Sequence, residues 1–297
     1  MLARVTRLLF VAWFGALAAL TMRGAVHGWS GGVWLGLYLL LFAHPTVLAI
    51  EFWLVRRVGL RTSGTRIPAT TLVRAWFGEW VDSTRVFGWR LPWRVDAVPD
   101  HLPATARGRR GVVLVHGFIC NRAFWYPWLA RLRALDRAFV AVSLEPVFAE
   151  IDGYAASVDE AVARVEAATG LPPVVIAHSM GGLVVRAWLR EQPARRGRVA
   201  SVVTIGSPHR GTWLASMALS PNAKQMRLDA AWMNALAEAP THADLFTCWW
   251  SECDQIVFPP PTAVLPGSES RQLRGVAHVS LGRREEIWND LVARLGA

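Results

Sequence analysis

The feature that most constrains the fold is the stretch PPVVIAHSMGGLVVRAWLREQ, residues 172–192. Its first half is a short, continuous apolar run, which is typical of a strand buried on both faces of a sheet. Its second half, from residue 180, has apolar residues at helical spacing. Because few and mostly small residues separate the two halves, the chain must pass from strand to helix through a tight corner.

The same alternation of apolar runs and helical segments continues through the C-terminal two thirds of the chain. The segments 151–170 and 287–295 have helical spacing, and Gly170 is a stop signal for the first. The expected strands cover residues 111–118, 139–146, 172–179, 199–208, 243–254 and 271–279. This pattern predicts an α/β domain over residues 111–297, with a mostly parallel sheet covered by helices on both faces.

The corner itself holds Ser179 between His178 and Met180, with small residues at Ala177 and Gly181. A serine on such a turn has a strained backbone, and its hydroxyl projects above the carboxyl edge of the sheet. Ligand sites of parallel sheets lie at this edge. The helix that follows adds free N–H groups and a partial positive charge. We therefore interpret Ser179 as a nucleophile rather than as a turn residue.

Five stretches of the domain resemble, in the same order, motifs of bacterial lipases and esterases with the α/β-hydrolase fold. They are VLVHGF, AHSMGGLV, TIGSPHRGT, CDQIV and GVAHVSLG. The AHSMGG corner is similar to that of the small bacterial lipases, which also have alanine in place of the first glycine. The resemblance covers most of residues 111–297 and none of the N-terminal region. It implies an α/β-hydrolase fold and a serine carboxylester hydrolase.

A serine nucleophile needs a base within hydrogen-bond reach, and in this fold the chain order is serine, acid, histidine. His278 lies between the last expected strand and the last helix, where the family places its base. His209 belongs to a turn, and we expect it to be structural or to lie at the rim. His242 lies in a proline-rich connection, where we expect it to be exposed.

The acid is expected where a strand ends between the serine and the histidine. Asp254 follows the apolar run LFTCWW and precedes QIV, which matches the lipase pattern. It would orient the imidazole of His278 and stabilise its cation. Glu252, two residues earlier, is the competing candidate.

Two backbone N–H groups are needed to stabilise the charge that develops on a substrate carbonyl oxygen. Met180, directly after the serine, supplies one of them, and the resemblance implies Phe118 as the second. His116 and Gly117 shape the loop before Phe118, where the glycine allows close approach of the backbone. We expect no cofactor, and no metal site, because the eight histidines lack ligand spacing.

Residues 209–242 lie between two expected strands and are rich in large apolar side chains. They form either a small cap over an acyl pocket or helices packed on the sheet.

Two apolar stretches, residues 8–22 and 32–55, open the chain. The second is long enough to cross a bilayer at about 20 residues per span. His44, Pro45 and Glu51 interrupt it and indicate a kink and an interfacial end. We expect a transmembrane helical hairpin over residues 1–60, and the alternative is a cleaved signal peptide.

Residues 61–110 are expected to contain an amphipathic helix over 69–88 and a polar linker over 94–110. The helix either packs on the α/β domain or lies in the membrane interface. Its apolar face comprises Leu72, Val73, Trp76, Phe77, Trp80, Val81 and Phe87.

Positive charge is concentrated in residues 1–110, where 14 arginines accompany 5 acidic residues. This region also holds eight of the 16 tryptophans, which fits a contact with anionic lipid better than one with nucleic acid. Only Arg23 lies between the two apolar stretches, whereas arginines precede and follow them, so both ends are expected in the cytoplasm. We therefore expect a bacterial inner-membrane protein with a cytoplasmic α/β domain, and a periplasmic domain is the alternative.

These features predict a membrane-anchored serine carboxylester hydrolase that cleaves an acyl ester or lipid through an acyl-enzyme. The same three residues would also serve a thioesterase or an acyltransferase. An alternative of another class is a non-catalytic membrane scaffold or transport-associated protein. The sequence specifies neither the acyl chain length nor the oligomeric state.

Overall fold

The α/β domain is built on a six-stranded, fully parallel sheet in the order β2-β1-β3-β4-β5-β6. The computed structural model describes residues 1–62, 64 and 66–296. The strands are β1 (Val112–Val115), β2 (Phe139–Ala141), β3 (Val174–His178), β4 (Ser201–Ile205), β5 (Phe246–Trp250) and β6 (Glu269–Gln272).

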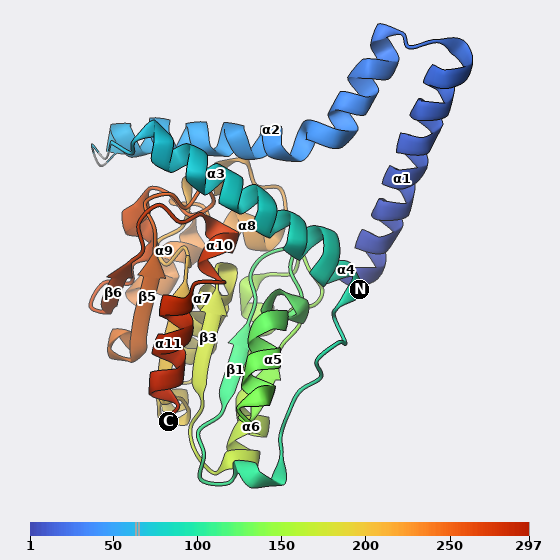
Figure 1. Ribbon diagram of the computed structural model, residues 1–297. Coiled ribbons are helices and arrows are strands. Elements are labelled where there is room, and N and C mark those ends of the chain that lie inside the picture. The colour runs from blue at the N-terminus through green and yellow to red at the C-terminus, as the bar shows by residue number, and fades with distance from the viewer. Residues whose placement is uncertain (63, 65, 297) are drawn as a thin grey trace.

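Helices cover both faces of this sheet, as the sequence predicted (Figure 1). One face carries α5 (Tyr126–Ala134) and α11 (Glu285–Arg294), and the other carries α6 (Ala155–Thr169) and α7 (Met180–Glu191). Strand residues alternate between the two cores: Val113 and Val115 pack with α6 and α7, whereas Val112 and Leu114 pack with α5 and α11. Because both faces are buried, these strands are apolar without interruption.

The strand order changes direction between β1 and β3. The chain leaves β1 for β2 at the sheet edge and then returns to place β3 on the other side of β1. At such a switch point, the loops after the two strands diverge and leave a crevice at their carboxyl ends. Those loops begin here with His116 and Ser179.

The prediction of a strand over residues 271–279 was wrong for most of these residues. β6 ends at Gln272, and after a turn at Gly275, where φ is +69°, His278 begins the short helix α10 (His278–Leu281). The side chains of β6 are polar and mostly exposed, whereas Val276 and Ala277 are buried outside the sheet. The apolar pattern of this stretch therefore reflects burial in a loop rather than pairing in a strand.

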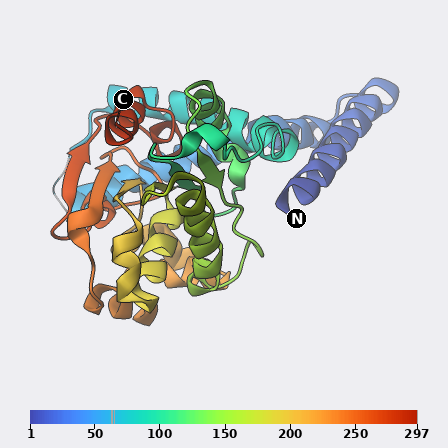
Figure 2. The same cartoon turned by 90° about the horizontal axis from the view of Figure 1, so that it is seen from below.

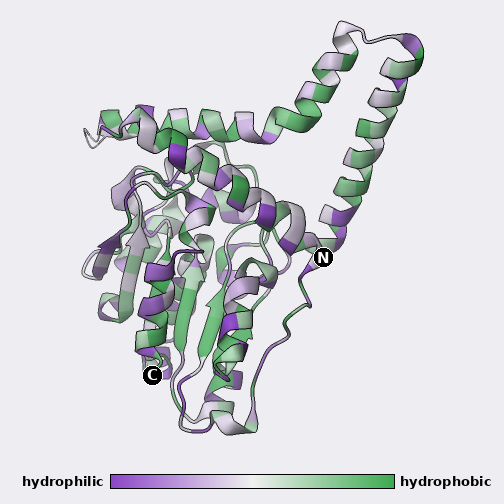
Figure 3. Ribbon diagram, in the orientation of Figure 1, coloured by the Kyte–Doolittle hydropathy of each residue, from purple (hydrophilic) through white to green (hydrophobic). Residues whose placement is uncertain are grey.

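Two long apolar helices precede the domain: α1 (Leu2–His27) and α2 (Gly31–Thr62). By length and composition, both could cross a membrane. The indole of Trp13 donates to the carbonyl oxygen of Leu40 at 3.0 Å, which joins them as an antiparallel hairpin. This hairpin projects beyond the domain (Figure 2), and apolar residues line most of its length (Figure 3).

α2 is longer than the hairpin and bends away from it (Figure 1). Pro45 lies inside the helix, and proline bends helices because it removes a backbone hydrogen bond. The second part of α2 lies across the domain, where Phe52 and Val55 pack with Cys253 and Phe258. The structure thus agrees with the expected kink, but the second arm of the hairpin ends well before residue 60.

The amphipathic segment forms α3 (Ala69–Ser83), which continues through a π-helical stretch (Thr84–Arg90) into α4 (Leu91–Trp93). One side of α3, with Leu72 and Ala75, is buried against the domain and α2. The opposite side exposes Val73 and Phe77. The structure therefore confirms the packing of this helix on the domain, and a contact of its exposed side with a membrane stays a prediction.

The segment 209–242 contains α8 (Pro221–Gln225) and α9 (Ala231–Glu238). Met226, Met233 and Leu236 are buried in the same core as α6 and α7, whereas Leu219 is exposed. Part of this segment therefore packs on the domain core, while Met217, Leu219 and Leu228 remain exposed.

Candidate active site

Ser179 occupies the corner between β3 and α7 in a strained backbone conformation, with φ +55° and ψ −129°. Its N–H donates to the carbonyl oxygen of Ile205 in the neighbouring strand β4 at 2.8 Å, which fixes the corner to the sheet. A Cβ atom at Gly181 would lie 2.7 Å from the carbonyl oxygens of Val115 and His116. Only glycine therefore fits at this position, as the corner pattern predicted.

The loop after β1 closely approaches the serine. A Cβ atom at Gly117 would lie 2.7 Å from the Cβ atom of Ser179. His116 is buried and holds this loop: its Nδ1 donates to the Gly117 carbonyl at 2.8 Å, and its Nε2 accepts from the Leu144 N–H at 2.9 Å. Burial lowers the pKa of His116 to about 4, so the imidazole is neutral, as this pair of bonds requires.

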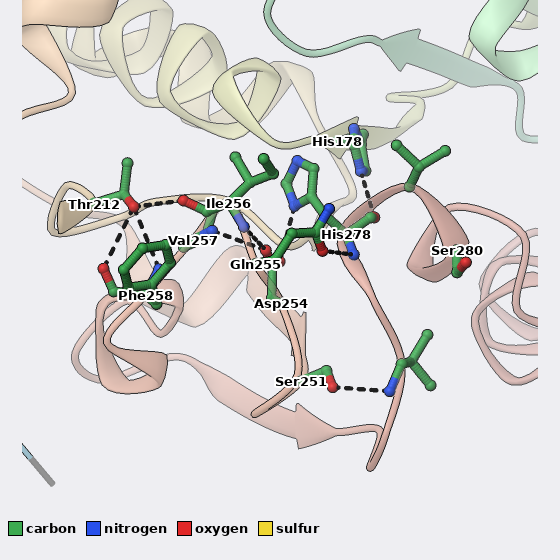
Figure 4. A network of polar contacts seen from close by, with 12 residues as sticks. His178, Thr212, Ser251, Asp254, Gln255, Ile256, Val257, Phe258, His278 and Ser280 are labelled. Atoms are coloured by element: carbon green, nitrogen blue, oxygen red, sulfur yellow. Dashed lines mark hydrogen bonds and ion pairs between the residues drawn. The ribbon is translucent and has the colours of Figure 1, made fainter. Parts of the chain in front are cut away.

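Asp254 and His278 form a buried pair at the same edge of the sheet (Figure 4). The His278 Nδ1 donates to Asp254 Oδ2 at 2.8 Å. Asp254 Oδ1 accepts from the N–H groups of Ile256 and Val257 at 2.9 and 2.8 Å, so the carboxylate cannot rotate freely. This arrangement holds His278 in the tautomer that leaves Nε2 without a proton.

Gly206, directly after β4, connects this pair to the serine corner. A Cβ atom there would lie 2.8 Å from Asp254 Oδ2 and 3.2 Å from His278 Nδ1. The preceding residue, Ile205, accepts the hydrogen bond from Ser179. The three residues are therefore neighbours, although the Ser179 hydroxyl has no hydrogen-bond partner within the described chain. Bonds of this kind are often longer in the absence of substrate.

The surroundings of His278 favour its protonated form. Burial alone would lower the pKa of His278, but the charge of Asp254 and its hydrogen bond outweigh burial and raise this pKa. The carboxylates of Glu79 and Glu51 act in the same direction. A raised pKa brings a histidine closer to the basicity that a general base needs.

His178 lies beside the pair but differs from it chemically. Its ring centroid is 4.6 Å from that of His278, and its Nε2 donates to the His278 carbonyl at 3.1 Å. Burial, together with the positive charge of His278, lowers the pKa of His178 well below its ordinary value. His178 is therefore a neutral support for the backbone of His278.

The two expected oxyanion donors are free. Among the residues that the structure describes, the backbone N–H groups of Phe118 and Met180 have no hydrogen-bond partner. Phe118 lies in the loop after β1, and Met180 begins α7 directly after the corner that follows β3. Free N–H groups at this point can donate hydrogen bonds to an anion or to a developing oxyanion.

The competing candidates lie elsewhere. The buried Nε2 of His209 shares a 3.0 Å hydrogen bond with the hydroxyl of Thr204, which is a structural contact. His242 is half-buried and precedes β5, at the amino end of the sheet, far from its carboxyl edge. Glu252 accepts from the Gly275 N–H at 2.9 Å.

Sequence reasoning missed Glu79. This residue of α3 is fully buried, and it binds the backbone of α10 directly after His278. The signal was present, because Leu72, Ala75, Glu79 and Ser83 recur at helical spacing on one face, and an acid stands on that otherwise small and apolar face.

Residues 112–237 match a family model described as alpha/beta hydrolase fold. This match includes Phe118, Ser179 and Met180, but not Asp254 or His278. No curated protein matches the chain.

Two solved lipases have a similar structure. One is the mature form of lipase BlEst2 from Bacillus licheniformis, with 15% sequence identity and a TM-score of 0.56, covering 63% of this chain and 92% of that chain. The other is lipase B from Aspergillus fumigatus, with 20% identity and a TM-score of 0.53, covering 61% of this chain and 52% of that chain. This chain thus spans about half of the Aspergillus lipase. At these identities the likeness shows the fold, and the domain has the α/β-hydrolase fold.

Proposed function

We propose that this protein is a membrane-anchored serine carboxylester hydrolase of the lipase or esterase type. The observation that carries the proposal is the buried hydrogen bond between His278 and Asp254, at the sheet edge where Ser179 sits in its strained corner. The lipase names of the two similar structures support an ester as the substrate.

In this proposal, His278 Nε2 removes the proton from the Ser179 hydroxyl as its oxygen attacks the ester carbonyl. The resulting oxyanion accepts hydrogen bonds from the N–H groups of Phe118 and Met180. His278 then gives its proton to the leaving alcohol, and an acyl-enzyme remains on Ser179. Water, deprotonated by His278, attacks this acyl-enzyme, releases the carboxylic acid and restores the serine. Asp254 accepts a hydrogen bond from Nδ1–H of His278 throughout and stabilises the imidazolium.

The anchor in this proposal is the hairpin of α1 and the first part of α2. The outer side of the layer formed by α2 and α3 would then contact the membrane surface, because it exposes Ile50, Trp53 and Phe77. The guanidinium of Arg57 lies 4.9 Å from the Trp53 ring, as expected for a pair that meets lipid headgroups. We propose the cytoplasmic face of a bacterial inner membrane, following the arginine distribution.

A fluorophosphonate probe tests the proposal, because it labels only an activated serine. The detergent-solubilised wild type should be labelled, and Ser179→Ala and His278→Ala should not. Ser157→Ala, on α6, is the matched control and should be labelled like the wild type. A folded wild type that resists labelling would favour the scaffold alternative. Labelled protein would then be offered oxygen esters, thioesters and alcohol acceptors, which separates hydrolysis from acyl transfer.

A further inference from the structure

Glu79 is an ionisable residue in an unusual position. It lies on α3, in the N-terminal region outside the α/β domain, and its side chain is 0% exposed. A carboxylate is costly to bury unless hydrogen bonds replace its water. Glu79 is therefore expected to have a specific set of donors.

The donors come from α10 and from the loop after β5. Glu79 Oε1 accepts from the Val279 N–H at 2.9 Å and from the Gln255 side-chain amide at 2.8 Å. Glu79 Oε2 accepts from the N–H groups of Val279 and Ser280 at 3.1 Å each. Since every partner is a donor, the site satisfies the ionised carboxylate, although burial raises the pKa of Glu79.

These contacts enclose the backbone of His278. Val279 and Ser280 directly follow the histidine, and the side-chain Oε1 of Gln255 accepts from the His278 N–H at 3.1 Å (Figure 4). Gln255 is in turn the neighbour of Asp254. Glu79, on α3, thus links the segment that carries Asp254 to the segment that carries His278.

We propose that Glu79 is a positioning residue for His278, so that the N-terminal helical layer completes the active site as well as anchoring the protein. The inference rests on the proposed function of His278 as the general base. Glu79 fixes the start of α10 and thereby the place of the imidazole relative to Ser179 and Asp254. It also adds its negative charge to that of Asp254. Glu51, whose pKa burial raises to about 7, and the neutral ring of His178 are the other titratable groups beside His278.

The test compares three variants of the full chain. In Glu79→Gln the charge is lost and one oxygen becomes a donor that faces other donors; kcat/KM should fall about 10- to 100-fold. The acid limb of its pH profile should move to lower pH, because the charge that stabilises the imidazolium is gone. Glu79→Asp keeps the negative charge, but its side chain is one methylene shorter and reaches the N–H groups of α10 less well. We therefore expect kcat/KM to fall while the acid limb of the pH profile stays in place.

Asp82→Asn is the matched control. Asp82 lies one turn further along α3 and also binds α10, where it accepts from the Ser280 hydroxyl at 2.8 Å. It further pairs with Arg283, just after α10, but it does not contact the segment of Asp254. A merely structural contact between α3 and α10 would make this variant behave like Glu79→Gln. We expect kcat/KM within about threefold of the wild type and an unchanged acid limb.

A folded Glu79→Gln protein with the wild-type kcat/KM and acid limb would overturn the inference. If that variant does not fold, Glu79→Asp decides: a wild-type rate overturns the inference, and a reduced rate at an unchanged melting temperature supports it. The titration of the His278 Nδ1 proton by NMR, assigned by its loss in His278→Ala, gives a readout without substrate. An inactive wild type whose Nδ1 titration still shifts to lower pH in Glu79→Gln would refute the proposed function but not the coupling.

Discussion

Asp254 and Glu252 lie two residues apart after β5, yet they bind different partners. Asp254 accepts a hydrogen bond from the Nδ1–H of His278 at 2.8 Å, whereas Glu252 accepts from the Gly275 N–H at 2.9 Å and from the Gln272 side-chain amide. Asp254 is buried, and its other oxygen is fixed by two backbone N–H groups. Glu252 instead supports the turn that precedes α10.

This difference predicts that two amide substitutions lower kcat to very different extents. Asp254→Asn should lower kcat by about 10³- to 10⁴-fold, because an amide no longer holds the imidazole in the correct tautomer. Glu252→Gln should change kcat by less than about tenfold, since an amide oxygen can still accept from Gly275. Ester hydrolysis by both variants checks this, and equal losses in the two would remove the assigned role of Asp254.

The raised pKa of His278 predicts the acid limb of the activity. As general base, His278 must be neutral, so kcat/KM should rise with pH and reach half its maximum above about 6.5, the ordinary histidine value. By the same linkage, the stabilisation from the protonated pair is complete below the unfolded pKa and is lost as pH rises through the folded pKa. A pH profile of kcat/KM with a midpoint below this value would contradict the assignment.

The serine corner predicts a stability difference between two glycines. Gly181→Ala should destabilise the protein by about 1–3 kcal/mol, because the new Cβ meets two backbone carbonyl oxygens that cannot move aside. Gly153→Ala is the control: its Cβ would have no heavy atom within 4 Å, so the effect should stay within about 0.5 kcal/mol. Denaturant unfolding measures both, and equal midpoints would show that the corner has room.

The proposed anchor predicts the behaviour of a truncated chain. The full chain should remain with membranes after alkaline carbonate extraction, whereas a chain without residues 1–43 should be released, because it lacks α1 and the first part of α2. The truncated chain keeps Glu79 and the part of α2 that packs on the domain, so it should still be labelled by the fluorophosphonate probe. Retention of the truncated chain would place the anchor in the layer of α2 and α3 instead. The mass of the intact chain purified from membranes separates an anchor from a cleaved signal peptide.

Much of the α/β domain could be predicted from the sequence because its signals are local. A continuous apolar run such as Val174–His178 predicts a buried strand, and the small residues around Ser179 predict the turn into α7. The expectation failed for residues 271–279, where apolar residues are buried in a loop and a short helix. Buried segments are apolar whether or not they pair with a neighbouring strand, so an apolar run alone does not identify a strand.

The sequence by itself determined the parallel sheet with helices on both faces, the strand–turn–helix corner and the presence of two long apolar helices. These features depend on residues a few positions apart, whose spacing is visible in the chain. Only the tertiary structure decided that α2 bends onto the domain and that Glu79 binds the backbone beside His278. Val279 lies 200 positions from Glu79 in the chain, and no local pattern specifies which distant N–H groups a buried carboxylate will meet.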